Sequence, residues 1–349
     1  ALLKVNRVDA ALLSFQSLQA NYPTSKFLSD AKYYLGVCYF KRHDWASVLG
    51  VLEPFVQETS QASDFVSEGR YLVALSFFNL RQYDKALGVF HEMLKLYADR
   101  EAVVQKIGLG IARTKYEMGN VKEALALFRE ISFRHAGTDA GQEALMQLGR
   151  HAMSSGLYEK AVEYYFQALE GYPQSDKKGL LHYELGRSYL GLGRMDKALE
   201  QYRQVDVKDD AGLFVKAKLA IAEIFSRELD SAKAIETYEG IIQTSPEFKR
   251  DALVKIAQIY RKSDKPDEAL KAYEGALSSP KVSSDISNAQ IQFQIGETFE
   301  VLNQWDKAVE AYLKIPYLYA KEQVWVVKAY LRVAKIYEDR EDGEKALTA

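Results

Sequence analysis

The sequence predicts an all-α fold of stacked antiparallel helix pairs, and three observations predict it. A five-residue pattern, seen as Tyr-Asp-Lys-Ala-Leu at Tyr83–Leu87, recurs along the whole chain with a period close to 37 residues. A small residue, here Ala74, stands 12 residues before its central residue Ala86, and a bulky apolar residue, here Phe90, follows four residues after it. A fixed period of about 20–50 residues indicates one supersecondary unit that is repeated along the chain.

The central residue of each copy marks what we call the second-helix small site. Ten copies occur at intervals of 35 to 39 residues, so ten units are at least partly present. These sites are Ala11, Val48, Ala86, Ala124, Ala161, Ala198, Ala234, Ala269, Ala308 and Ala346.

The residue 12 positions earlier marks the first-helix small site. It is Gly or Ala in each of the nine units after the first, and the residue before it is always apolar. Glycine inside a helix costs about 0.5–1 kcal/mol relative to alanine, so the glycines here indicate that another helix approaches closely. The first-helix small sites are Gly36, Ala74, Ala112, Gly149, Gly186, Ala222, Ala257, Gly296 and Ala334.

The bulky residue four positions after each second-helix small site forms what we call the ridge site. Residues at i and i+4 share one face of a helix, so each second helix presents a small notch beside a ridge. Helix pairs of this kind stack, because each pair covers the apolar face that its neighbour exposes. The ridge sites are Leu52, Phe90, Phe128, Tyr165, Tyr202, Tyr238, Tyr273 and Tyr312.

The elements follow in order from an N-terminal second helix at Asp9–Asn21. Complete pairs come next, such as Arg70–Tyr97, where two apolar-striped helices are joined at Asn79–Asp84. Proline and polar clusters near Asn21, Gly171, Thr244 and Ser278 mark boundaries between pairs. We expect one solenoid domain over residues 1–349 that is cut within a repeat at both ends, so that the natural protein continues on at least one side.

Two prolines and three polar stretches depart from the regular pattern. Pro54 and Pro316 fall inside or near the ends of second helices, where proline removes a backbone hydrogen bond and is expected to kink or shorten the helix. The stretches near residues 59–64, 207–212 and 281–287 are the expected flexible joints.

Composition excludes several classes of function. The hydrophobic content of 48% is enough for a continuous core, and the net charge of −2 with a pI near 6.3 argues against nucleic acid as a partner. No apolar run approaches the length of about 18 residues that a membrane span needs. Cys38 is the only cysteine and lies on an apolar helix face, where a buried small side chain is favoured over a reactive thiol.

Nothing in the sequence indicates an enzyme, a cofactor or a metal site. The five histidines show no metal-ligand spacing, and the glycine-containing segments at Gly108 and Gly191 do not complete a phosphate-binding loop. We therefore expect no catalytic residue, no cofactor and no metal.

The helix pair with small residues 12 apart, an aromatic four beyond, and Tyr-Pro at the pair boundary resembles the tetratricopeptide repeat. The usual unit of that family has about 34 residues, and nearly every unit here is longer. The resemblance implies a right-handed superhelical α-solenoid of about nine to ten units, whose concave wall is made mainly by the first helices and binds a protein or peptide.

The longer units, with boundary segments such as Asn21–Phe40 and Gly171–Leu190, resemble those of bacterial cell-envelope proteins. This resemblance implies a periplasmic or envelope-associated protein, and a cytoplasmic location stays open. The chaperone-binding members of the family hold a C-terminal carboxylate with lysine and asparagine. No asparagine pair stands at the matching sites here, which argues against that function.

The expected wall consists of the residues three before, one after and four after each first-helix small site, which we call the wall sites. In the N-terminal units they form an apolar, aromatic strip, which is explained either by core packing or by a partly exposed binding surface. The candidate binding residues of this strip are Tyr33, Phe40, Tyr71, Leu75 and Phe78.

The central units place Arg113, Arg150 and Arg187 at the same wall site of three successive repeats. Three guanidinium groups on one wall could grip carboxylates of a partner, or each could pair with a nearby glutamate or be solvated. The candidate residues beside them are Tyr116, Met153 and Tyr183. The C-terminal wall turns acidic, with residues such as Glu223, Glu297 and Glu300.

The favoured function is a non-enzymatic scaffold that holds a protein partner or peptide segment in its concave groove, in a bacterial envelope assembly. Two alternatives stay open: a self-associating structural or spacer module, and the regulatory arm of a larger multidomain protein.

Overall fold

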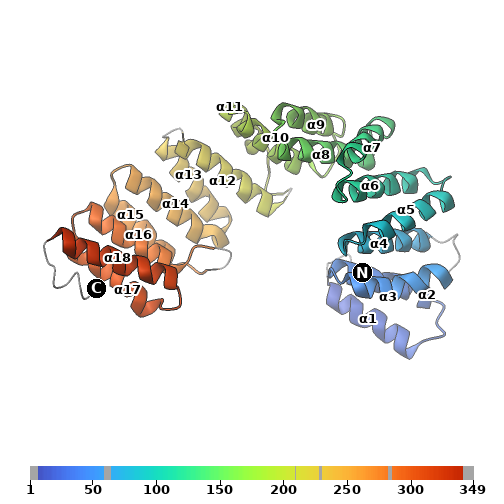
Figure 1. Ribbon diagram of the computed structural model, residues 1–349, viewed down its shortest axis with the longest axis horizontal. Helices are drawn as coiled ribbons and strands as arrows, with labels where there is room; N and C mark the ends of the chain where they lie inside the picture. Colours follow the sequence, from blue (N-terminus) through green and yellow to red (C-terminus); the bar gives the residue numbers. More distant parts are fainter. Residues whose placement is uncertain (1–6, 59–63, 209, 228–229, 282–284, 341–349) are drawn as a thin grey trace. The chain divides into compact units, whose positions relative to one another are not determined.

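The computed structural model describes residues 7–58, 64–208, 210–227, 230–281 and 285–340. These residues form eighteen α-helices and one short 3₁₀ helix, and the helices follow one another as antiparallel pairs (Figure 1). The all-α fold expected from the repeat pattern is confirmed. The chain divides into two compact units, Ala1–Gln174 (unit 1) and Ser175–Ala349 (unit 2).

Unit 1 begins with a second helix, as the sequence predicts, and continues with four complete pairs. Each helix packs against the next in chain order. Its helices are α1 (Val8–Asn21), α2 (Leu28–Lys41), α3 (Trp45–Glu58), α4 (Asp64–Asn79), α5 (Tyr83–Leu96), α6 (Glu101–Glu117), α7 (Val121–Arg134), α8 (Asp139–Ser154) and α9 (Tyr158–Glu170).

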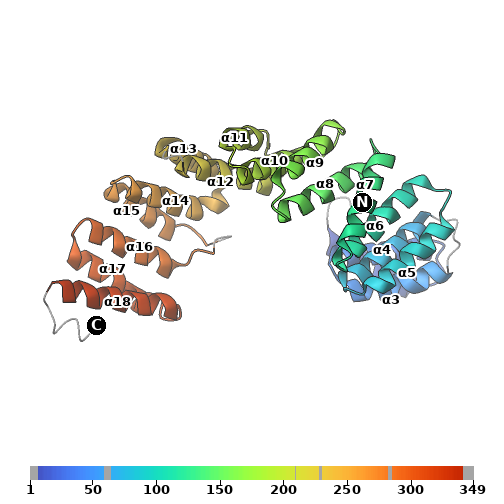
Figure 2. The ribbon, with the colours of Figure 1, turned by 45° about the horizontal axis from the view of Figure 1, so that its top comes forward.

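Unit 2 has four complete pairs and a final first helix, and Figure 2 shows α14 to α18 stacked in chain order. Its helices are α10 (Lys178–Gly191), α11 (Met195–Arg203), α12 (Ala211–Arg227), α13 (Ser231–Thr244), α14 (Lys249–Lys262), α15 (Pro266–Leu277), α16 (Asn288–Val301), α17 (Trp305–Leu318) and α18 (Gln323–Asp339), with the 3₁₀ helix η1 at Pro246–Phe248.

Small and ridge sites meet inside each pair. A Cβ added at Gly149 would lie 2.5 Å from the ring of Tyr165, and one added at Gly186 would lie 2.6 Å from the ring of Tyr202. The second-helix small sites of α3 to α17 are fully buried. The ridge side chain therefore occupies the space that the missing side chain leaves, as the spacing predicts.

First helices of successive pairs also contact one another. Such contacts join α2 to α4, α4 to α6 and α6 to α8 in unit 1, and α10 to α12 and α16 to α18 in unit 2. In unit 1 the first helices thereby form a continuous surface, and in unit 2 the surface of the first helices is joined by these two contacts and by the ion pair between Arg261 of α14 and Glu297 of α16. We call this surface the wall, and it carries the wall sites defined above.

The turn from first to second helix uses one residue with positive φ in nearly every described pair. This residue stands five positions before the second-helix small site. It is Gly119, Gly156 and Gly193 in three pairs, and His43, Arg81, Asp264 and Asn303 in four others. A left-handed residue is therefore a fixed part of the turn, and four pairs adopt it without the glycine that relieves its strain.

The two prolines do not shorten their helices, so this part of the expectation is wrong, whereas the expected kink stays a prediction. The helices α3 and α17 both run for 14 residues, like α5, α7 and α13, and continue beyond Pro54 and Pro316. Phe55 and Val56, which follow Pro54, are buried. Burial of these side chains offsets the hydrogen bond that the proline removes.

The predicted joints fall partly outside the described residues. Residues 59–63, 209 and 282–284, which make up much of the three stretches, are not described, and the joints stay a prediction. The tenth small site, Ala346, also lies outside the described residues. Ala334 of α18, whose expected pairing helix would contain Ala346, is half-buried.

Buried polar side chains at the start of first helices bind carbonyl groups at the end of their pairing helices. The Gln142 amide in α8 donates to the Ala168 carbonyl of α9. The Arg250 guanidinium in α14 is 2% exposed and donates to the Ala276 carbonyl in the last turn of α15 and to the Ser279 carbonyl just after that helix. It also donates to the Ile286 carbonyl and the Asn288 side chain, which precede and begin α16. These contacts satisfy carbonyl groups at helix ends that have no partner within the helix.

Candidate partner-binding wall

The first two pairs of unit 1 carry an aromatic cluster on the wall. Tyr33 of α2 lies 4.8 Å from Phe65 of α4 and 6.3 Å from Phe55 of α3, measured between ring centroids. Phe40 packs edge-on against Trp45 at 5.0 Å. Tyr33 and Phe40 are only half-buried. Core packing and a partly exposed binding surface, the two interpretations open from the sequence, therefore each describe part of the cluster, because the rings contact the core and keep an exposed edge.

The α4 wall sites continue this strip. Tyr71 lies 5.8 Å from the Phe90 ring beneath it, and burial raises the pKa of its hydroxyl. Leu75 packs partly buried against the same core, and Phe78 lies beside Tyr83. The Arg113 guanidinium of α6 stands 5.6 Å above the Phe78 ring. Arg113 therefore extends the apolar strip with a positive charge that an aromatic face holds in place.

Tyr116, a wall site of α6, meets α8 at His151, which stands beside the wall site Arg150. The Tyr116 hydroxyl lies 2.9 Å from Nδ1 of His151, and the two rings pack edge to face. Arg150 pairs with Glu143, seven residues and about two helical turns earlier on α8, at 3.2 Å. Met153 is half-buried nearby in the sequence, on the last turn of α8.

In unit 2 the predicted residues Tyr183 and Arg187 lie on α10. The Tyr183 ring lies 5.7 Å from Tyr202, and burial raises the pKa of the Tyr183 hydroxyl. Arg187 pairs with Glu184 at 3.0 Å on the exposed surface.

The three arginines are thus held in different ways. Arg150 and Arg187 pair with glutamates of their own helices, which is one of the alternatives open from the sequence, whereas Arg113 stacks on an aromatic ring. Arg113 and Arg150 lie on contacting helices of unit 1, and Arg187 belongs to unit 2. Exposed pairs of this kind are worth about 0–1 kcal/mol, so a partner's carboxylate can compete for the guanidinium.

The C-terminal wall differs from the acidic strip expected from the sequence. Arg261 of α14 pairs with Glu297 of α16 at 2.6 Å. Glu300 binds Arg332 of α18 and accepts a hydrogen bond of 2.5 Å from the Tyr312 hydroxyl. The acidic wall sites of α16 are therefore neutralised by arginines of the neighbouring first helices. Arg332 escapes detection because it stands outside the three wall positions considered.

The ridge tyrosines of unit 2 bring hydroxyl groups beneath this wall. Tyr202, Tyr238, Tyr273 and Tyr312 are all less than 5% exposed, and burial raises the pKa of each hydroxyl, to about 12 for Tyr238 and Tyr273. They are therefore neutral hydrogen-bond donors near pH 7. In unit 1 three of the four ridge sites are Leu or Phe instead.

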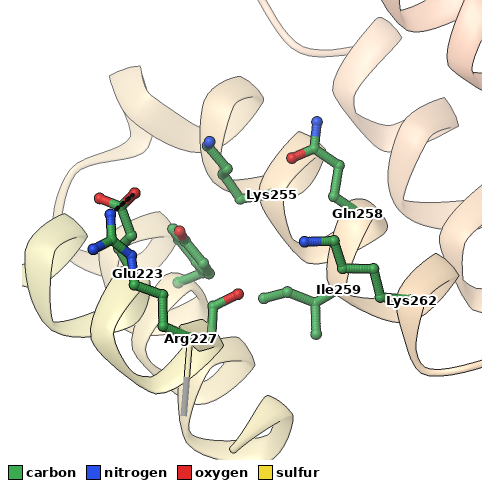
Figure 3. A pocket seen from close by; sticks show the side chains of 8 residues that line it. Glu223, Arg227, Lys255, Gln258, Ile259 and Lys262 are labelled. Atoms are coloured by element: carbon green, nitrogen blue, oxygen red, sulfur yellow. Dashed lines mark hydrogen bonds and ion pairs between the residues drawn. The ribbon is translucent and has the colours of Figure 1, made fainter. Parts of the chain in front are cut away.

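A pocket of about 300 Å³ opens in the wall between α12 and α14, above Tyr238 of α13. Figure 3 shows Glu223 and Arg227 on α12 facing Lys255, Gln258, Ile259 and Lys262 on α14. Glu223 pairs with Arg227 at 3.3 Å. Within the described part of the chain, Lys255, Lys262 and the Tyr238 hydroxyl have no hydrogen-bonding or ionic partner.

Sequence reasoning missed this pocket, although a signal for it was present. The ridge site changes from Leu or Phe to Tyr at Tyr165 and remains Tyr through Tyr312. This change adds a hydroxyl at a position that packing alone would fill with a phenyl ring. The pocket lies where such a hydroxyl coincides with lysines on the next first helix.

The other side chains that could carry chemistry have structural surroundings. Cys38 is buried and burial raises the pKa of its thiol, as expected for a packed side chain. His182 bonds Gln201, and His43 packs on Trp45. No group of three or more metal-ligating side chains occurs among the described residues. Over the same residues, none of the helices combines the length and apolar character that crossing a bilayer requires.

Comparison with known proteins agrees with the helix-pair geometry. Sequence profiles of the tetratricopeptide repeat match residues 68–100, 109–176, 181–206 and 254–322. Together these segments cover more than half of the chain. Two of them, 68–100 and 181–206, lie on one described helix pair each, and 109–176 and 254–322 each extend over two, so the profiles and the structure identify the same units.

Two curated relatives are similar over part of their length. Lipopolysaccharide assembly protein B of Escherichia coli K12 is 24% identical over 181 residues, which are 50% of this chain and 44% of the relative. Tetratricopeptide repeat protein 21B of Xenopus laevis is 27% identical over 144 residues, which are 41% of this chain and 10% of the relative. The chain thus spans less than half the length of either.

Among solved structures, the C-terminal part of a TPR repeat-containing protein from Cytophaga hutchinsonii has a similar fold. The TM-score is 0.52 at 16% sequence identity, and the match covers 72% of this chain and 96% of the other. The repeat register, the helix pairs and these matches lead to one assignment: the chain belongs to the tetratricopeptide repeat family, whose repeats form scaffolds for protein–protein interaction.

Proposed function

We propose that this chain is a non-enzymatic scaffold whose wall holds an extended or helical segment of a partner protein, within a bacterial envelope assembly. The observation that carries the proposal is the wall of unit 1, where half-buried aromatic side chains stand beside exposed arginines on contacting helices. Tyr71 and Phe78 with Arg113 above the ring form its centre. Aromatic and arginine side chains are the residue types that contribute most to binding at protein interfaces.

The envelope part of the proposal rests on two supports. The longer repeat period resembles that of envelope proteins, and the similar Escherichia coli protein is named for lipopolysaccharide assembly.

The arginines Arg113, Arg150 and Arg187 provide the test. Replacing all three with glutamate should reduce capture of the partner from extracts of the cells that make the protein, by at least about tenfold, because attraction at each site becomes repulsion. Thermal unfolding should change little, because the three side chains are exposed and only Arg113 contacts an aromatic ring.

The matched control reverses three exposed arginines away from the wall sites, Arg81, Arg129 and Arg203. It has the same net charge and should retain the partner. Equal capture by both variants, or failure of the wall variant to fold, would contradict the proposal. The self-association alternative makes a different prediction, which is a molecular mass that rises with protein concentration in light scattering.

A further inference from the structure

We infer that the pocket between α12 and α14 binds the carboxylate side chain of an aspartate or glutamate in the partner segment, with Lys255, Lys262 and the Tyr238 hydroxyl as its donors. This inference rests on the proposed function and assigns it a second contact point, in unit 2. The pocket also has a polar edge formed by Ser226 and Gln258 and an apolar side at Ile259.

The charge of the pocket favours an anion. Arg227, Lys255 and Lys262 bring three positive charges, and Glu223 brings one negative charge. Glu223 is already paired with Arg227 on the same helix. The two lysines therefore remain as an excess of positive charge, and a carboxylate is the side-chain group that complements them.

At other steps of the wall, individual cations pair with carboxylates on adjacent first helices. Across the next step, from α14 to α16, Arg261 pairs with Glu297, and from α16 to α18 Arg332 pairs with Glu300. In unit 1 Lys106 of α6 pairs with Glu68 of α4 at 2.7 Å. These three cations each find a carboxylate on an adjacent first helix, whereas the α12–α14 step supplies none to Lys255 or Lys262 among the described residues.

A second observation, independent of the lysines, comes from Tyr238 beneath the pocket. Tyr238 is 4% exposed, contributes to the pocket lining, and its hydroxyl has no partner in the part of the chain that the structure describes. The equivalent Tyr312 hydroxyl donates a hydrogen bond of 2.5 Å to the Glu300 carboxylate. The same ridge position thus already binds a carboxylate at another step of unit 2, and Tyr238 offers the same donor to one from outside.

The size of the pocket admits an acidic side chain. A volume of about 300 Å³ holds a carboxyl group with its methylene stem and leaves room for water. Ile259 at 5% exposure provides an apolar surface for that stem.

The experiment is a selection from a library of random 12-residue peptides displayed on phage, where peptides have no free C-terminus and only side chains can supply the anion. Wild-type chain should select peptides with Asp or Glu at one fixed position. The Lys255→Glu/Lys262→Glu variant should select Lys or Arg at that position instead. The control Lys249→Glu/Lys271→Glu changes the same charge at exposed sites outside the pocket and should keep the acidic preference.

A second variant separates binding from folding. Tyr238→Phe keeps the ring in its packed position and removes only the hydroxyl, so the unfolding temperature should hold while the affinity for a selected acidic peptide falls about three- to tenfold. The pocket assignment would be overturned if the peptides that the wild-type chain selects share no acidic position, or if all variants bind a selected acidic peptide with equal affinity. Either result would leave the scaffold function standing. Retention of no peptide at all would count against both.

Discussion

At the scale of single residues, the contact between a glycine and a tyrosine ring determines how closely two helices of a pair approach. The Gly186 backbone lies so near Tyr202 that an added Cβ would be 2.6 Å from the ring. Gly240 on α13, in the same unit, has no atom within 4 Å of such a Cβ. The two glycines differ in their surroundings, although both stand inside helices.

Replacing Gly186 with leucine should therefore lower the free energy of unfolding by about 1–3 kcal/mol, because the ring and the new side chain would occupy the same space. Gly240→Leu should leave it unchanged or raise it by up to about 1 kcal/mol, because leucine favours the helix more than glycine does. Urea denaturation followed by circular dichroism measures both. A neutral Gly186→Leu would show that the pairing described here is wrong.

The small and ridge residues also explain how much of this fold the sequence could predict. The spacing of these residues reflects contacts between helices that are neighbours in the sequence, and the same contacts recur in each repeat. The helix pairs, their order and the face that forms the wall could therefore be predicted from this spacing. The partners of individual wall residues did not follow. Arg332 pairs with Glu300 from a position that is not one of the three wall sites defined from the sequence. Tyr238 contributes its hydroxyl to a pocket, whereas the repeat pattern shows only that a bulky apolar residue stands there.

At the scale of elements, the turn between the helices of a pair has one requirement, a residue with positive φ. Arg81 has φ of 59° and is exposed, whereas Gly119 takes the equivalent place in the next pair with φ of 86°. The left-handed conformation costs about 1–2 kcal/mol for a residue with a Cβ.

Arg81→Gly should raise the free energy of unfolding by up to about 1 kcal/mol, since relief of the strain exceeds the extra freedom that glycine gives the unfolded chain. Gly119→Ala should lower it by about 1 kcal/mol for the same reason. Thermal and urea midpoints of the two variants, compared with the wild type, test this pair. Shifts of the same sign would contradict the role assigned to the turn.

Proline marks the limit of prediction at this scale. The sequence shows the hydrogen bond that Pro54 removes but not the burial of Phe55 and Val56 beyond it. Helix length here depends on tertiary packing, which a single segment does not reveal.

At the scale of the whole molecule, the two units differ in the chemistry of their ridge sites. Unit 2 has tyrosine at all four, and burial raises the pKa of the Tyr238 and Tyr273 hydroxyls to about 12. In the unfolded chain a tyrosine loses its proton near pH 10. Between about pH 10 and 12 the unfolded state therefore binds fewer protons than the folded state, and stability falls as the pH rises.

The Tyr238→Phe/Tyr273→Phe variant should consequently lose less stability than the wild type between pH 8 and pH 11, since phenylalanine has no proton to lose. Urea midpoints at the two pH values measure the difference. Tyr317→Phe, at a side chain that is 86% exposed, is the control and should behave like the wild type. Identical losses for the double variant and the wild type would exclude the ridge hydroxyls as the cause.

The buried guanidinium of Arg250 links the folding of one pair to the synthesis of the next. Two of its partners, Ile286 and Asn288, lie 36 and 38 residues further along the chain. A ribosome adds about 5–20 residues per second, so these partners are made about 2–8 s after Arg250. Once α15 is complete at Leu277, the α14–α15 pair still lacks these two contacts of Arg250 until a further 9 to 11 residues have been made. The repeats of unit 2 thus have similar geometry, but they do not fold independently during synthesis. The α14–α15 pair gains all the contacts of Arg250 only after synthesis of the following repeat has begun.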